Sequence, residues 1–292
     1  MHNEEQSVQS EEYRKSLISL HIAVMLFGLS AVLGQFVTAP AVIVAGGRVI
    51  CSSLLLFLLS IAGRASLKLK SRKDYGIAVF AGIILAVHWT TFFQAIQSSS
   101  VAIGTITFST FPLFLTFLEP LLFREKLKVT SVLSAAVLLL GVFITIPEFS
   151  LENQITIGIL WGMVSSLSYA VLSLANRYLS RSYAARTVCL YEQGTAAVVL
   201  LPAIFFVKTS WTTQNIFCIA AIGFICTAFA HSLYVAAQRK VKAQTAGIIS
   251  GMETVYGIVY ALLFLGEVPG IRELIGGAVI LGVALVISLR KE

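Results

Sequence analysis

The sequence is poor in charged residues and nearly devoid of aspartate. Only 12% of its 292 residues are charged, whereas soluble domains contain about 25%, and Asp74 is the single aspartate. This argues against an aspartate-rich, magnesium-binding diphosphate site and against an aspartyl dyad. The sequence also lacks an HExxH zinc motif, a GxSxG nucleophile elbow and a nucleotide-binding phosphate loop. We therefore expect neither an enzyme nor direct use of ATP.

Cysteine is also scarce. The four cysteines are Cys51, Cys189, Cys218 and Cys226, and they show no paired spacing. All except Cys218 fall well inside apolar stretches of the chain. We expect no disulfide framework, no metal site and no cofactor.

Apolar residues make up most of the chain, at 57%, and the mean hydropathy is +0.88. A helix needs about 20 mostly apolar residues to cross a hydrocarbon core about 30 Å thick. Short polar breaks leave ten such stretches, so we expect an all-α integral membrane protein with ten transmembrane helices. The predicted ranges are 17–37, 41–62, 75–97, 101–122, 128–147, 154–175, 186–207, 213–237, 243–265 and 271–289.

The positions of the cations predict the orientation of the chain in the membrane. If the polar tail 1–16 is cytoplasmic, nearly all of the 21 lysines and arginines lie in the tail, in inner loops or at the C-terminal end. The exceptions are Lys208 and Arg272 outside, and Arg48 within a helix. Cytoplasmic loops are enriched in Lys and Arg, so we expect both termini in the cytoplasm and the protein in the inner (plasma) membrane. Cations spread over several short loops do not indicate a nucleic-acid surface.

The two halves of the chain are similar to each other. A shift of 142 residues lays "FFQAIQSSSVAIGTITFSTFPLF" over "YVAAQRKVKAQTAGIISGMETVY", with Ala95 on Ala237 and Ser109 on Gly251. Five helices per half is an odd number, so copies at 17–147 and 154–289 would be oppositely oriented in the membrane. The sequence therefore predicts two inverted five-helix repeats.

Several motifs occur together at this spacing. A helix in each half passes a polar or proline position and then closes on "RE" or "GE", and a helix containing "LLLGVFI" or "VILGVAL" follows. This arrangement resembles the EamA-type, ten-helix branch of the drug/metabolite transporter superfamily over nearly the whole chain. The resemblance implies a central cavity lined by the first, third, fourth, sixth, eighth and ninth helices. It also implies export of amino acids or other small metabolites, although some relatives take metabolites up.

Glu253 is the first candidate for contact with a substrate or a proton. It lies about 15 Å inside its predicted helix, close to the bilayer midplane. An ionised side chain there costs about 2.5–3.5 kcal/mol unless it faces a cavity or a partner. Phe111 is its equivalent in the first half, and Tyr256 follows on the same helix. A structural hydrogen bond is the alternative role for Glu253.

His88 is the second candidate, again in the middle of a predicted helix, with Trp89 and Phe92 close by. An imidazole among aromatic rings can bind an amphiphilic ligand or accept a proton. A neutral histidine bonded to a backbone carbonyl is the alternative. Tyr169, in the sixth range, is an expected wall residue of the cavity.

A polar stripe follows the fourth predicted helix. Its members Thr105, Ser109, Pro112 and Thr116 recur at steps of three and four residues, which keeps them on one face. Such a stripe can form half of a translocation path, with Pro112 freeing a backbone carbonyl for a ligand, a water or a hinge. Hydrogen bonds between helices explain the Ser and Thr residues nearly as well.

Two more charges lie within predicted helices. Arg48 is near the outer face and Glu192 near the inner face, so we do not expect them to pair directly. Each is expected to snorkel or to neutralise a neighbour, and Arg48 is alternatively an entry charge that attracts carboxylates.

Taken together, these features predict a secondary active transporter of small metabolites, an exporter with amino acids favoured, that works by alternating access. The other candidates are a channel, a structural membrane protein and an uptake carrier of the same fold. The expected partners are a small-molecule substrate and the lipid bilayer, with protons as a candidate coupling ion. The sequence does not indicate an oligomeric state.

Overall fold

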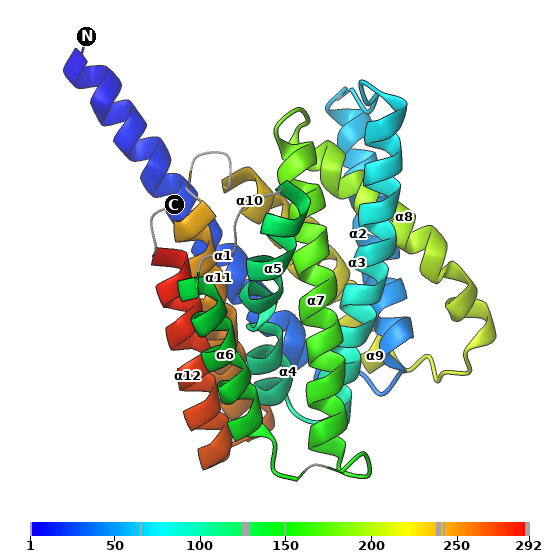
Figure 1. Cartoon of the computed structure of the whole chain (residues 1–292). Helices are drawn as coiled ribbons and strands as arrows, with labels where there is room; N and C mark the ends of the chain where they lie inside the picture. Colours follow the sequence, from blue (N-terminus) through cyan, green and yellow to red (C-terminus); the bar gives the residue numbers. More distant parts are fainter. Residues whose placement is uncertain are drawn as a thin grey trace.

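The computed structural model describes residues 2–64, 66–123, 129–148, 150–237, 241 and 243–289. Within these ranges the chain is helical and contains no strand. Figure 1 shows the helices side by side in one bundle, with the start of α1 and the end of α12 at the same end. The helices are α1 (His2–Phe36), α2 (Ala41–Ala62), α3 (Arg72–Ser98), α4 (Val101–Phe108), α5 (Phe111–Phe123), α6 (Val129–Thr145), α7 (Gln154–Ser180), α8 (Ala185–Phe206), α9 (Thr213–Gly223), a π-helix (Phe224–Phe229), α10 (Ala230–Ala237), α11 (Ala243–Leu265) and α12 (Ile271–Leu289).

Helices occupy every range that the hydropathy pattern predicts. Seven helical stretches in the described part of the chain are long and apolar enough to cross a membrane, and two shorter apolar helices cover 132–145 and 249–265. The first helix differs from the expectation because it begins at His2, so most of the polar tail is helical. Some of the cations behind the topology prediction lie outside the described residues. They are Arg124, Lys126, Lys128, Arg239, Lys240, Lys242, Arg290 and Lys291.

The fourth predicted helix is two helices, α4 and α5, that meet at a turn before Pro112. Proline has no N–H, so it cannot bond to the carbonyl four residues earlier. That carbonyl, of Phe108, instead accepts a hydrogen bond from the Ser166 hydroxyl of α7 at 3.1 Å. The carbonyl that Pro112 frees therefore joins α4 to α7.

The eighth predicted helix contains a π-helical turn between α9 and α10. The Thr227 hydroxyl donates to the carbonyl of Ile222, five residues earlier, at 2.7 Å. Such π-helical turns form a bulge in an α-helix and are frequent at functional sites. Here the bulge carries Thr227 toward α2.

The most extensive contacts between helices join elements that are far apart in the sequence. α3 packs against α7, α2 against α8, α1 against α11, and α6 against α12. Lipid is as apolar as the helix surfaces, so such contacts depend on small residues and on polar bonds between helices. Gly82 of α3, for example, lies directly against the backbone of Glu192 and the side chain of Thr195 on α8.

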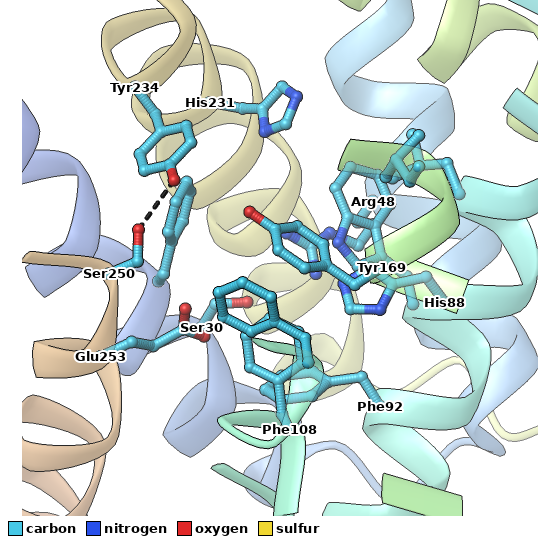
Figure 2. Close-up of a pocket in the computed structure, with 15 residues that line it drawn as sticks. Ser30, Arg48, His88, Phe92, Phe108, Tyr169, His231, Tyr234, Ser250 and Glu253 are labelled. Atoms are coloured by element: carbon cyan, nitrogen blue, oxygen red, sulfur yellow. Dashed lines mark hydrogen bonds between the residues drawn. The ribbon is translucent and has the colours of Figure 1, made fainter. Parts of the chain in front are cut away.

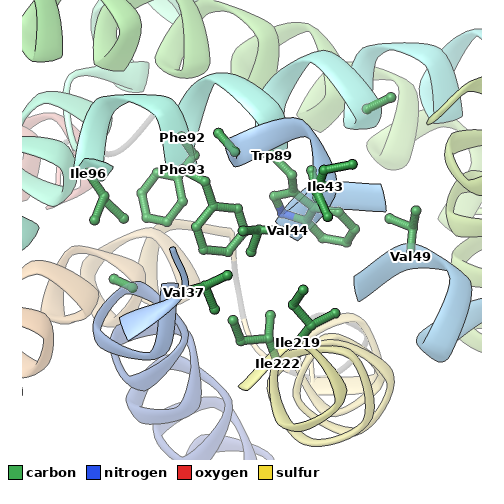
Figure 3. Packing of buried hydrophobic residues seen from close by; sticks show 14 of the residues in the cluster. Val37, Ile43, Val44, Val49, Trp89, Phe92, Phe93, Ile96, Ile219 and Ile222 are labelled. Carbon is green, nitrogen blue, oxygen red and sulfur yellow. The ribbon is translucent and has the colours of Figure 1, made fainter. Parts of the chain in front are cut away.

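The largest apolar cluster lies among α1, α2, α3, α8 and α9. Figure 3 shows rings from α3 facing the aliphatic side chains of α2 and α9. Phe93 is fully buried there, and its ring fills the space beside Gly34 of α1. This cluster packs α2 against α3 at the edge of the central pocket.

Candidate functional site: a central pocket

A pocket with a cavity volume of about 60 Å³ lies at the centre of the bundle. Its walls come from α1, α2, α3, α4, α5, α7, α10 and α11, and no described residue of α6 or α12 takes part. The side chains that line it are Phe27, Ser30, Arg48, Leu85, His88, Trp89, Phe92, Phe108, Phe111, Tyr169, Leu172, His231, Tyr234, Ser250 and Glu253 (Figure 2). The family resemblance implied a cavity lined by the first, third, fourth, sixth, eighth and ninth predicted helices, and each of these contributes to the lining. Arg48 of α2 is an additional lining residue.

Glu253 lies on the α11 wall of the pocket and is 9% exposed. Among the described residues, its carboxylate has no hydrogen-bond or ion-pair partner. The next residue, Thr254, points the other way and bonds to the Ser109 hydroxyl at 2.7 Å and to the Thr105 carbonyl at 3.1 Å. These bonds set the rotation of α11 against α4, and that rotation turns Glu253 into the pocket.

Arg48 supplies the opposite charge from α2. It is 3% exposed and so does not snorkel to the membrane surface, which differs from one expectation. Its guanidinium carbon lies 3.9 Å from the centre of the Trp89 ring, a cation–π geometry. Its Nε donates to the Thr227 hydroxyl at 2.9 Å, so the π-helical bulge helps to hold it. Arg48 and Glu253 are too far apart for a direct ion pair.

Aromatic rings form the wall between these two charges. Tyr169 lies 5.0 Å from both Phe108 and Phe111, measured between ring centres, and 5.2 Å from His88. The two phenylalanines stack with ring centres 5.8 Å apart. Phe92 completes the cluster at 5.6 Å from Phe108. Such a wall favours a flat or apolar group on the ligand.

His88 is tied to α7 through one of its ring nitrogens. Its Nδ1 lies 3.0 Å from the Ser165 carbonyl oxygen and 2.9 Å from the Ser165 hydroxyl. A carbonyl can only accept, so that bond requires the hydrogen to be on Nδ1. This is the backbone-bonded geometry expected as the alternative role, and the ring nevertheless lines the pocket.

Several candidate residues lie outside the pocket lining. Thr105 and Ser109 face Thr254 on α11, in a contact between helices. The Thr116 hydroxyl bonds to the Pro112 carbonyl within α5. Tyr256 points toward His21, with its hydroxyl 3.4 Å from the histidine Nδ1. The polar stripe of the fourth predicted helix therefore lies along contacts between and within helices.

Phe27, Ser30 and Tyr234 line the pocket but were not among the candidates, whereas Ser250 was expected to line a cavity because it shares a helical face with Glu253. Tyr234 and Ser250 join α10 to α11 through a bond of 2.7 Å between their hydroxyls (Figure 2), and Ser30 and Phe27 contribute from α1. His231 and Tyr234 are three residues apart on α10, a spacing that places both on one helical face. That spacing is the signal in the sequence that could have identified them.

Glu192 does not line the pocket. It is fully buried on α8, with its Oε2 atom 3.8 Å from Nε2 of His231. As expected, it does not pair with Arg48. Its neighbour His231 does line the pocket, so the two sites share one side chain.

A multi-pass helical membrane protein with opposite charges in a buried central pocket has the architecture of a membrane transporter. The chain belongs to the EamA-like transporter family, which it matches over residues 14–146 and again over 156–289. It is 24% identical to an uncharacterized transporter, YxxF, of Bacillus subtilis (strain 168), over 98% of this chain and 93% of that protein. It is 23% identical to the pseudopaline exporter CntI of Pseudomonas aeruginosa (strain UCBPP-PA14), over 87% and 88% of the two chains. A solved crystal structure shares the fold, with a TM-score of 0.66 and 16% identity over 94% of this chain and 97% of that one.

Proposed function

We propose that this protein is a secondary active transporter that exports a small zwitterionic metabolite, with amino acids favoured. The observation that carries the proposal is the presence of Arg48 and Glu253 on separate walls of one pocket without a direct ion pair. Buried charges are costly unless they are paired. A ligand with a carboxylate for Arg48 and an ammonium group for Glu253 would pair both at once.

The aromatic wall supports an apolar or aromatic side chain on that ligand. Phe108, Phe111 and Tyr169 present ring faces and edges between the two charged groups. An amino acid with its backbone charges between Arg48 and Glu253 would direct its side chain against these rings.

Helix contacts support two inverted halves and ten crossings. If α1 to α6 form the first half, α7 corresponds to α1, α8 to α2, α10 to α3, α11 to α4 with α5, and α12 to α6. Under this correspondence, the contact of α1 with α11 in one half is equivalent to the contact of α7 with α4 and α5 in the other. In the same way, the contact of α3 with α7 is equivalent to the contact of α10 with α1. α2 meets α8, and α6 meets α12, its own counterpart. Such a pattern suits alternating access, in which one half rocks against the other.

The proposed orientation has both termini in the cytoplasm of a bacterial-type plasma membrane. The first and last helices begin and end on one side of the bundle, which supports it (Figure 1), as does the cation bias. The relative that is named an exporter supports outward transport. Of the two sequence candidates for proton coupling, Glu253 is assigned to the substrate, and His88 Nδ1 bonds to Ser165.

The test begins with a thermal-shift screen of the purified protein against amino acids and related metabolites. Compounds that raise the melting temperature are then tested in proteoliposomes for saturable uptake that is stimulated by the same compound on the opposite side. A channel would give linear flux without this stimulation, which would contradict the proposal.

Glu253→Gln is the decisive variant because it removes the charge and keeps the shape. Truncating one member of a buried charge pair costs about 2–5 kcal/mol, which corresponds to about 30-fold or more in affinity. Binding measured by titration calorimetry should weaken accordingly. The matched control is Glu267→Gln, at the aqueous end of the same helix run, which should bind as the wild type does. Unchanged affinity in Glu253→Gln would refute the assigned role.

A further inference from the structure

A second group of buried polar side chains lies beside the pocket, at the contact of α8 with α10. Glu192 is 0% exposed, and neither of its carboxylate oxygens has a hydrogen-bond partner among the described residues. His231 Nε2 is likewise buried without a hydrogen bond in that part of the chain, 3.8 Å from Glu192 Oε2. The two groups are within reach of an ion pair but do not form a hydrogen bond.

The charge of this pair depends on the number of protons it holds. With one proton it is neutral overall, either as carboxylate and imidazolium or as carboxylic acid and neutral imidazole. With none it leaves a negative charge in the bundle, and with two it leaves a positive one. Each of these states would be an uncompensated buried charge, which is strongly unfavourable.

We propose that Glu192 and His231 form a binding site for one proton, which the transporter exchanges for its substrate. Only the exchange for a substrate rests on the proposed function. Proton binding by the pair can be measured without any substrate.

In the described part of the chain, no other charged side chain forms an ion pair with Glu192 or His231. The polar and titratable groups that face it or interact with it are Asn176 and Tyr169 of α7, Cys189 of α8, and His88 of α3. Arg48 lies across the Trp89 ring, and Trp89 also packs edge-on against His231 with ring centres 6.2 Å apart. Two described residues are also too few ligands for a metal ion, which binds four or more.

His231 gives the proton a connection to the pocket. Its ring lines the pocket, while its Nε2 faces Glu192 outside the lining. α10, which carries His231, follows the π-helical turn, whereas Glu192 is fixed on α8 against Gly82 of α3. A shift of α10 relative to α8 would separate the two groups and admit water, and either group could then release the proton.

Trp89 provides a direct readout because it touches His231. An imidazolium beside an indole ring quenches its fluorescence more than a neutral imidazole does. In a protein with Trp161→Phe and Trp211→Phe, Trp89 is the remaining tryptophan of the three. Its fluorescence should change in one step with pH. The step should disappear in His231→Asn, and it should move to lower pH by roughly one to three units in Glu192→Gln, because the imidazolium loses its counter-charge.

The matched control is His21→Asn, a histidine that lies beside Tyr256 and outside the pair; its pH step should be that of the parent. Glu192→Gln is nearly isosteric, so it decides the question even if His231→Asn does not fold. An identical step in Glu192→Gln and the parent would overturn the proposal. So would a fluorescence response to Na⁺ at constant pH that Glu192→Gln abolishes, because the site would then bind a metal cation.

Transport separates this proposal from the function itself. With a compound identified by the thermal-shift screen, Glu192→Gln should retain exchange at equal concentrations and lose accumulation driven by a pH gradient. Accumulation equal to the wild type would refute the coupling role. If wild-type protein transports nothing, the proposed function fails, and the fluorescence titration still decides whether the pair binds a proton.

Discussion

Replacing Gly28 with alanine should separate α1 from α11 and displace Glu253. A methyl group at Gly28 would lie 2.8 Å from the Gly257 nitrogen, 3.0 Å from the Tyr256 Cβ and 3.1 Å from the Glu253 carbonyl oxygen. Two of these atoms are backbone, so no side-chain rotation relieves the contact. The two helices must move apart at the turn that carries Glu253.

The size of the effect follows from these distances. Heavy atoms attract most strongly at about 3.5–4.0 Å, so the new methyl group would be too close by roughly 0.5–1 Å. Overpacking of this kind costs about 1–3 kcal/mol. A separation of the same size also weakens the binding of a ligand at Glu253, since charge-assisted hydrogen bonds need about 2.7–2.9 Å between heavy atoms.

The assay compares Gly28→Ala with Gly194→Ala, whose methyl group would meet no atom within 4 Å. Both glycines are helical, so both substitutions gain the same helix propensity, up to about 1 kcal/mol, and the difference between them isolates the clash. Gly28→Ala should melt several degrees below Gly194→Ala in detergent and should transport more slowly in proteoliposomes. Equal melting temperatures and equal transport would refute the close packing of α1 on α11.

Two further predictions concern bonds that hold α11 and its outer end. Thr254→Val removes the bonds to Ser109 and to the Thr105 carbonyl and should lower the free energy of unfolding by about 0.5–1.5 kcal/mol; because these bonds set the rotation that turns Glu253 into the pocket, affinity for the pocket ligand should also fall, and unchanged affinity would contradict this. Burial raises the pKa of Glu267 in the folded protein above its usual 4.5. The folded state therefore holds the Glu267 proton more tightly than the unfolded state does, and the stability that this difference contributes is present below pH 4.5 and is lost as the pH rises through the pKa of the folded state. Glu267→Gln should therefore lose less stability than the wild type in melts from pH 4.5 toward neutrality, and parallel curves for the two proteins would refute the assignment.

The site was only partly accessible to prediction, and individual residues show why. Glu253 could be identified because a carboxylate in the middle of an apolar helix is unfavourable without a cavity or a partner. Ser109 was a weaker candidate because a hydroxyl on a helix can face a cavity or a neighbouring helix at similar cost. His231 was missed because its distance from the membrane surface, judged from one helix, does not indicate which rings and carboxylates the other helices bring to it.

The sequence by itself determined the helical ranges, the membrane setting and the family resemblance. These properties are local or cumulative, since apolar length and the positions of cations act along the chain without reference to its packing. Only the tertiary structure decided which side chains share a space. Arg48 meets Trp89 because the π-helical turn supplies Thr227, and Glu192 meets His231 because α8 and α10 touch. Such contacts depend on helix rotation and on the close approach of small residues, and no single stretch of sequence encodes either.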